Sequence, residues 1–175
     1  MIVLFSSERI SLSHLQQSES VAGLPTIFLA GPTYRIKDME SWRTEAIRLF
    51  ETLGFNGVLY VPEPAAGKDW PDQDTQIAWE HKHLCQSSWI MFWIPRDMDL
   101  LPGMTTNIEW GMYWDSGKVN LGYPIGAPHM SYIDWCAEVI GVPVRHTLKD
   151  TVAVAKRGAE KWAYEGIASL PWDGL

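Results

Sequence analysis

Four runs of mainly apolar residues recur at even intervals along the chain, and each ends at a glycine or a proline. Runs of this kind are typical of strands that are buried on both faces of a sheet. A weaker run at 143–147 indicates a fifth strand, and the apolar residues near the N-terminus indicate a short added strand. The four main strands are predicted at residues 26–31, 57–62, 89–95 and 119–124.

Between these strands, apolar residues recur every three or four positions, which is the spacing of helices that bury one face. The first helical segment ends at Gly54, a residue type that commonly follows the last turn of a helix. Asp74 has the side chain of an N-cap for the second. The predicted helices cover residues 40–55, 74–88, 106–117, 131–141 and 148–162.

The alternation predicts an α/β protein with a flavodoxin-like three-layer sandwich. We expect a five-stranded parallel sheet of order 2-1-3-4-5, counted from the strand at 26–31, with helices on both faces. One domain is expected at 26–165, after a lead-in at 1–25 and before a tail at 166–175. Ligands of such folds bind beyond the carboxyl ends of the strands, where the winding of the sheet reverses.

Composition narrows the range of partners. The chain has 14 Lys and Arg against 21 Asp and Glu, a net charge of −7, so a nucleic-acid polymer is not expected. No apolar run is long enough to span a membrane, and the N-terminus lacks the basic residues of a signal peptide. Cys85 and Cys136 lie in apolar helical patterns without metal-ligand spacing, which predicts buried free thiols and a cytoplasmic protein, with a disulfide as the alternative. No cofactor and no metal site are expected.

Several loops that follow the predicted strands carry candidate binding residues. Gly31 and Pro32 begin a turn where a ligand can approach the backbone closely and bind to nearby helix amides, although such a pair is more often only a turn. The charged loop residues have solvent exposure as their alternative. The candidates are Gly31, Pro32, Arg35, Glu63, Asp97 and Asp99.

Glu109 admits two interpretations. Thr106 and Glu109 have the spacing of a capping box, in which both side chains bond to free amides at a helix start. The same position, in the first turn of a helix after the third strand, places a carboxylate at the crevice, where the helix dipole favours its ionised form and so favours a nucleophile. Gly111 supports the second interpretation, because a glycine inside a helix costs about 1 kcal/mol relative to alanine.

A set of motifs in consistent order and spacing resembles the nucleoside 2-deoxyribosyltransferase-like family. These motifs are "IFLAGP", "SWR", "WE", "WIMFWIP" and "MTTNIEWGMYWDSGK". The resemblance implies dimers or larger oligomers that cleave the N-glycosidic bond of a (deoxy)nucleoside or nucleotide and pass the sugar to another base or to water. By this match Glu109 is the nucleophile. The leaving base of such a reaction needs a proton, for which Asp97, Asp99 and an acid of the 65–73 loop are the candidates.

The resemblance also implies which residues bind the substrate. Gly31, Pro32 and Tyr34 match the loop that contacts sugar and base, and Gly111 matches a glycine that lets the helix lie against the sugar. Asn107, in the motif that precedes Glu109, is also expected to bind the substrate.

Two departures keep other functions open. Ser87-Ser88-Trp89 and Gly103 stand where classical transferases carry aspartates that help to bind the base. A non-catalytic nucleotide-binding or sensing module of the same fold is therefore the alternative to an enzyme. A flavin-binding relative of flavodoxin is disfavoured, because no loop rich in Ser and Thr follows the first strand.

Overall fold

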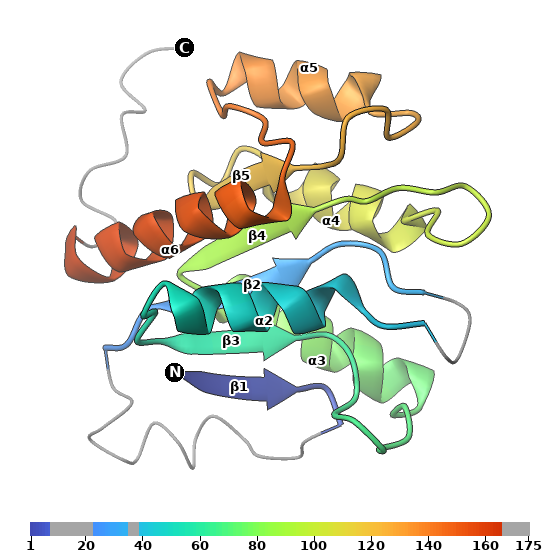
Figure 1. Cartoon of the computed structure of the whole chain (residues 1–175), viewed down its shortest axis with the longest axis vertical. Helices are drawn as coiled ribbons and strands as arrows, with labels where there is room; N and C mark the ends of the chain where they lie inside the picture. The colour runs from blue at the N-terminus through green and yellow to red at the C-terminus, as the bar shows by residue number, and fades with distance from the viewer. Residues whose placement is uncertain (8–22, 35–38, 166–175) are drawn as a thin grey trace.

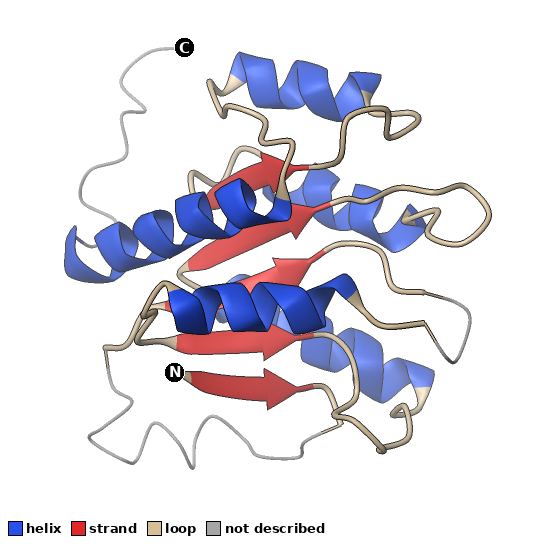
Figure 2. Ribbon diagram, viewed as in Figure 1, coloured by secondary structure: helices blue, strands red, loops and turns tan. Residues whose placement is uncertain are grey.

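The computed structural model describes residues 1–7, 23–34 and 39–165 of the chain, so the predicted tail at 166–175, most of the lead-in and Arg35 lie outside the described residues. Five parallel strands form one sheet that lies between helices on its two faces (Figure 1, Figure 2). The α/β three-layer class is thus confirmed. The strands are β1 (Ile2–Phe5), β2 (Thr26–Ala30), β3 (Val58–Val61), β4 (Trp89–Trp93) and β5 (Val119–Gly122).

The strand order is β1-β3-β2-β4-β5, with all neighbours parallel. The four main strands follow the predicted order, β3-β2-β4-β5, and the difference lies in the fifth strand. The N-terminal strand β1 supplies the fifth strand, beside β3. Residues 143–147 form only one isolated bridge, Gly122 with Arg145, because Pro143 lacks the amide that a strand donates to its neighbour.

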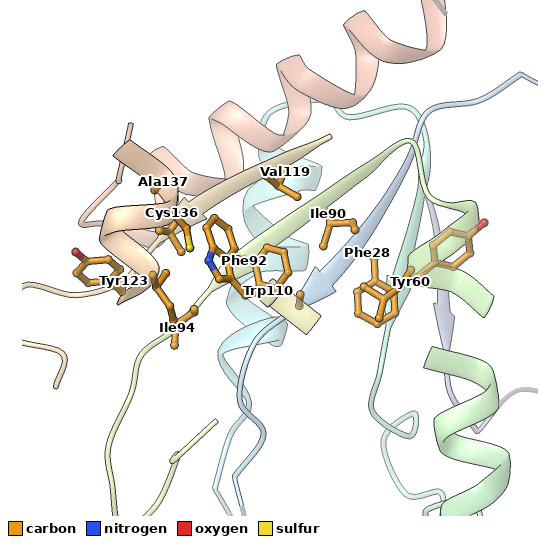
Figure 3. Close-up of a cluster of buried hydrophobic side chains, with 14 of the residues drawn as sticks. Phe28, Tyr60, Ile90, Phe92, Ile94, Trp110, Val119, Tyr123, Cys136 and Ala137 are labelled. Atoms are coloured by element: carbon orange, nitrogen blue, oxygen red, sulfur yellow. The ribbon is translucent and has the colours of Figure 1, made fainter. Parts of the chain in front are cut away.

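Each strand presents alternate residues to two separate cores, which explains the unbroken apolar runs. In β2, Ile27 and Leu29 pack beneath α2 (Trp42–Thr52) and α6 (Leu148–Glu165), whereas Phe28 and Ala30 face the other side. That other side is covered by α3 (Gln73–Gln86), α4 (Met104–Tyr113) and α5 (Ser131–Val139). Figure 3 shows this second core, in which Trp110 of α4 stands edge-on to Phe92 of β4 with ring centroids 5.1 Å apart.

The helix boundaries correct three predictions made from local motifs. Asp72, not Asp74, caps α3, because its side chain accepts a hydrogen bond from the amide of Thr75 at 3.0 Å. Helix α4 begins two residues earlier than predicted, so Thr106 is its third residue and does not cap it. Its N-cap is Gly103, which has a left-handed φ of 67° and makes no side-chain capping bond.

The two cysteines are free and differ in exposure. Cys136 is buried, as predicted, but Cys85 is exposed on α3. In the part of the chain that the structure describes, no helix is both long enough and apolar enough to cross a membrane.

Candidate functional site

A cavity of about 250 Å³ opens at the carboxyl edge of the sheet. It lies between the loop that follows β2 and the start of α4, which follows β4. These two neighbouring strands mark the point where the winding of the sheet reverses, so the cavity occupies the position that the fold class predicts. Its lining residues are Gly31, Pro32, Thr33, Arg43, Pro62, Trp70, Glu80, Pro102, Gly103, Met104, Thr105, Thr106 and Glu109.

Glu109 reaches the cavity from the second turn of α4, not from the first. Its side chain is only 9% exposed, and the neighbouring Trp110 is buried against the sheet and fixes the rotation of the helix. The capping-box interpretation is therefore wrong for this helix, because Thr106 lies within the first turn and the N-cap is a glycine. Glu109 remains as a carboxylate that faces a cavity.

Burial and, to a smaller extent, the nearby charge of Glu80 raise the pKa of Glu109 to about 8, although the charge of Arg43 opposes the shift. This is opposite to the expectation that the helix dipole keeps Glu109 ionised. The dipole acts mainly within the first turn of a helix. The sixth residue of α4 lies beyond that turn, so the cost of burying its charge dominates.

Glu80 is a second carboxylate in the cavity, and sequence reasoning missed it. It lies in the middle of α3, where Gln76 Nε2 donates to Glu80 Oε1 at 2.7 Å and to the carbonyl of Pro62 at 3.2 Å. Burial raises the pKa of Glu80, and the hydrogen bond from Gln76 and the charge of Arg43 oppose this shift. The residue is part of the "WE" motif, but a glutamate in the middle of a predicted helix carries no signal that it faces a cavity.

Arg43 supplies the positive charge of the site, and it was also missed. Its side chain is 1% exposed and bonds to Glu63 Oε1 at 2.6 Å. It also bonds to the carbonyls of Leu29 and Gly31 at 3.0 and 2.6 Å, and to Thr33 Oγ1 at 3.1 Å. The predicted binding residue Glu63 does not line the cavity but stands behind it as the counter-ion of Arg43.

The loop after β2 lines the cavity as predicted, with Gly31 and Pro32. Gly31 has no space for a side chain, because a Cβ would lie 2.1 Å from the carbonyl oxygen of Trp93. Trp42 Nε1 donates to the carbonyl of Pro32 at 3.0 Å and holds the loop from the other side. Tyr34 is not among the residues that line the cavity.

Four other predicted residues lie outside the cavity. Asp97 and Asp99 lie on an exposed loop, where the Asp97 side chain accepts from the amides of Asp99 and Leu100, each at 2.9 Å. Asn107 accepts a hydrogen bond from Arg96. Gly111 is exposed on α4, and a Cβ there would meet no atom within 4 Å, so the space is not needed inside this chain.

The described residues contain no group of three or more His, Cys, Asp or Glu side chains that could hold a metal ion. The polar groups that line the cavity are the carboxyl groups of Glu80 and Glu109, the guanidinium group of Arg43, threonine hydroxyls and the start of α4, which has no side-chain cap. Two carboxyl groups with raised pKa values beside one cation form an arrangement suited to acid and base chemistry.

These features define an α/β protein with a polar cavity beyond the carboxyl ends of its strands, where this class of fold binds its ligands. The chain belongs to the nucleoside 2-deoxyribosyltransferase like family, whose model matches residues 24–126. This range is more than half of the chain and includes Gly31, Arg43, Glu80 and Glu109. The family resemblance drawn from the motifs is thus confirmed. A comparison with curated proteins found no match.

Proposed function

We propose that the protein cleaves the N-glycosidic bond of a (deoxy)nucleoside or nucleotide and passes the deoxyribosyl group to another base or to water. The observation that carries this proposal is the pair of carboxyl groups, the buried Glu109 and the half-buried Glu80, that face one cavity beside Arg43. Two carboxyl groups, one as nucleophile and one as acid and base, are what a retaining glycosidic mechanism requires.

In the first step a Glu109 oxygen attacks C1′ while the bond from C1′ to the base nitrogen breaks. The electron pair stays on the base, which takes a proton from Glu80, and a glycosyl ester remains on Glu109. In the second step a base nitrogen or a water oxygen attacks C1′ and releases the Glu109 carboxylate, while Glu80 takes up the proton of the attacking group. Glu80 thus replaces Asp97 and Asp99 as the proposed acid, since Glu80 lines the cavity and they do not.

The proposed division of roles requires that the pair hold one proton and that this proton lie on Glu80 when the substrate is bound. Two carboxyl groups that repel each other hold one proton between them more readily than none, and the pair then titrates as a unit. Arg43 faces both groups and favours one ionised carboxylate. Substrate binding would leave the proton on Glu80 as the acid and the charge on Glu109 as the nucleophile.

The test is base release from deoxynucleosides and deoxynucleotides, with and without a free acceptor base, followed by chromatography. We expect Glu109→Gln to lose base release by about a thousandfold or more. We expect Glu80→Gln to lower the rate of base release about a hundredfold. The loss should be smallest for substrates whose base leaves without protonation. Denaturation of the wild-type protein after incubation with labelled substrate should leave sugar bound to Glu109. A wild-type protein that leaves every substrate intact would overturn the proposal.

One observation favours the non-catalytic alternative. In the ligand-free chain the pKa of Glu109 is about 8, so at neutral pH most molecules carry a proton where the nucleophile needs a charge. A nucleotide-binding module of the same fold predicts that calorimetry finds a ligand without turnover. In that case Glu109→Gln, which keeps the hydrogen-bonding shape of a protonated carboxyl group, would bind the ligand as tightly as the wild type.

We also propose that the protein is a homo-oligomer that buries the outer face of α4. Met104, Ile108 and Met112 follow one another at four-residue spacing on this face and are 61%, 64% and 52% exposed. Gly111 beside them would let another helix approach closely. Light scattering should find that Ile108→Glu lowers the molar mass to that of one chain, whereas Leu53→Glu, a similar change at the exposed residue that follows α2, should not.

A further inference from the structure

Helices α3 and α4 are joined by side chains at the ends that lie far from the cavity. Cys85 is the penultimate residue of α3, and its sulfur lies 3.1 Å from the hydroxyl of Tyr113, the last residue of α4. Over the described parts of the chain, this is the one hydrogen bond that links a side chain of α3 to a side chain of α4. The two helices carry Glu80 and Glu109, so this contact connects the elements that carry the carboxylates.

Lys118 reinforces the same junction from the start of β5. Its ammonium group donates to the carbonyls of Leu84, Cys85 and Ser87 at 3.2, 3.0 and 2.9 Å. All three ammonium hydrogens are used, and they satisfy carbonyls that the end of a helix leaves without partners. The same nitrogen lies 5.8 Å from the ring centroid of Tyr113, so a single cation contacts the ends of both helices.

The contacts of Cys85 and Tyr113 lie on the same two helices as the carboxylates, about one to one and a half turns further along each helix axis. Glu80 precedes Cys85 by five residues, and Glu109 precedes Tyr113 by four, which corresponds to about 7 and 6 Å along the helix axes. Glu80 and Glu109 repel each other whenever both are ionised. This repulsion favours a separation of α3 and α4 near the two carboxylates. The contacts at the ends of the two helices oppose that separation.

We infer that Cys85, Tyr113 and Lys118, here called the helix-end cluster, are positioning residues that set the separation of Glu80 and Glu109. This inference rests on the proposed function, because the separation of two carboxyl groups decides how they share a glycosidic reaction. Groups about 5 Å apart suit a nucleophile and an acid, whereas wider spacing admits a water between them. The cluster acts on the reaction only through the two helices and touches no substrate.

The first test uses turnover. Lys118→Met removes the ammonium group and keeps most of the side-chain length, and Tyr113→Phe removes only the hydroxyl. We expect kcat for base release to fall about tenfold in the first variant and about threefold in the second, with KM within twofold, because small errors of placement reduce chemistry more than binding. Lys118→Arg, which keeps the cation, should recover part of the loss. Lys82→Met, at an exposed lysine of α3, is the matched control and should leave kcat unchanged.

The second test does not need turnover. Carbon-13 labelled glutamate allows the Glu109 carboxyl group to be titrated by NMR, with its signal assigned by its absence in Glu109→Gln. We expect Lys118→Met to move the Glu109 pKa at least half a unit toward its ordinary value, because the carboxylates separate and water enters, and Lys82→Met to leave it in place.

The two tests fail in different ways. If wild-type protein releases no base, the proposed function is wrong, and the titration alone decides the role of the cluster. If Lys118→Met lowers the melting temperature but leaves both kcat and the Glu109 titration as in the wild type, the lysine only caps α3 and the inference is overturned. If Lys118→Met does not fold, Tyr113→Phe and Lys118→Arg decide the matter by the same two measurements.

Discussion

Two pairs of charged side chains meet at the carboxyl edge of the sheet, and they differ in how their charges are satisfied. Arg43 and Glu63 have opposite charges, contact each other at 2.6 Å, and bond further to Leu29, Gly31, Thr33 and Ser41. Glu80 and Glu109 have like charges and face a cavity, and burial raises the pKa of both. The difference indicates that the first pair holds the backbone of the loop in place, while the second supplies the two groups to which the proposed reaction assigns its chemistry.

The largest expected effect breaks the first pair. Arg43→Met leaves the Glu63 carboxylate and two carbonyl groups without their partner, so we expect the free energy of unfolding to fall by about 3–5 kcal/mol. Chemical denaturation measures this change. Arg48→Met is the matched control, because Arg48 is 64% exposed and its ion pairs lie at the surface. It should change stability by less than about 1 kcal/mol.

A double variant separates the charge of Arg43 from its shape. In Arg43→Met with Glu63→Gln no buried charge of this pair remains, and we expect the protein to regain part of the lost stability. If Arg43→Met is no more harmful than Arg48→Met, the first pair does not hold the loop. The contacts of Arg43 with Glu63 and the carbonyl groups would then contribute no more to stability than a surface ion pair.

The contrast between these pairs also shows what the sequence could reveal. Strands and helices were predictable because the apolar runs and the spacing of apolar residues are local properties. The short N-terminal strand was indicated but was given no place in the sheet, and the strand expected at 143–147 forms only one bridge, because neither segment specifies its neighbour. The predicted cap of α4 failed because the box pattern of Thr106 and Glu109 does not determine where the helix begins.

The site was predicted as far as it lies in loops at strand ends and on the helix that carries the family motif. Glu109, Gly31 and Pro32 were found in this way, and all three line the cavity. Arg43 lies in the first turn of α2 and Glu80 in the middle of α3, positions at which a charged residue is ordinarily solvated. Only the packing of α2 and α3 turns these two side chains toward the same space, and helix spacing alone does not specify that packing.

The stability of the protein should depend on pH through Glu109, a member of the second pair. The pKa of Glu109 is about 8 in the folded chain against an ordinary value of 4.5, so the folded chain keeps a proton that the unfolded chain releases. The stability from this group is fully present below pH 4.5 and is lost as the pH rises to about 8. Within that window the slope is at most about 1.4 kcal/mol per pH unit.

Melting curves between pH 5 and 9 measure this slope. Glu109→Gln cannot titrate and should become more stable than the wild type as the pH rises, whereas Glu138→Gln, at an exposed glutamate of α5, should follow the wild type throughout. If stability falls with pH equally in the wild type and in Glu109→Gln, ionisation of Glu109 is not the cause of the loss.

The smallest expected effect concerns Asp97, the acid that the sequence suggested and the cavity does not contain. Asp97→Asn keeps the side-chain oxygen that accepts from the amides of Asp99 and Leu100, so the loop should retain its turn and stability should change by less than about 0.5 kcal/mol. Base release should stay within twofold of the wild type, while Glu80→Gln loses about a hundredfold. The reverse result would make Asp97 the proton donor. It would require the exposed loop to close over the cavity, and Glu80 would then serve only as the charge that raises the pKa of Glu109.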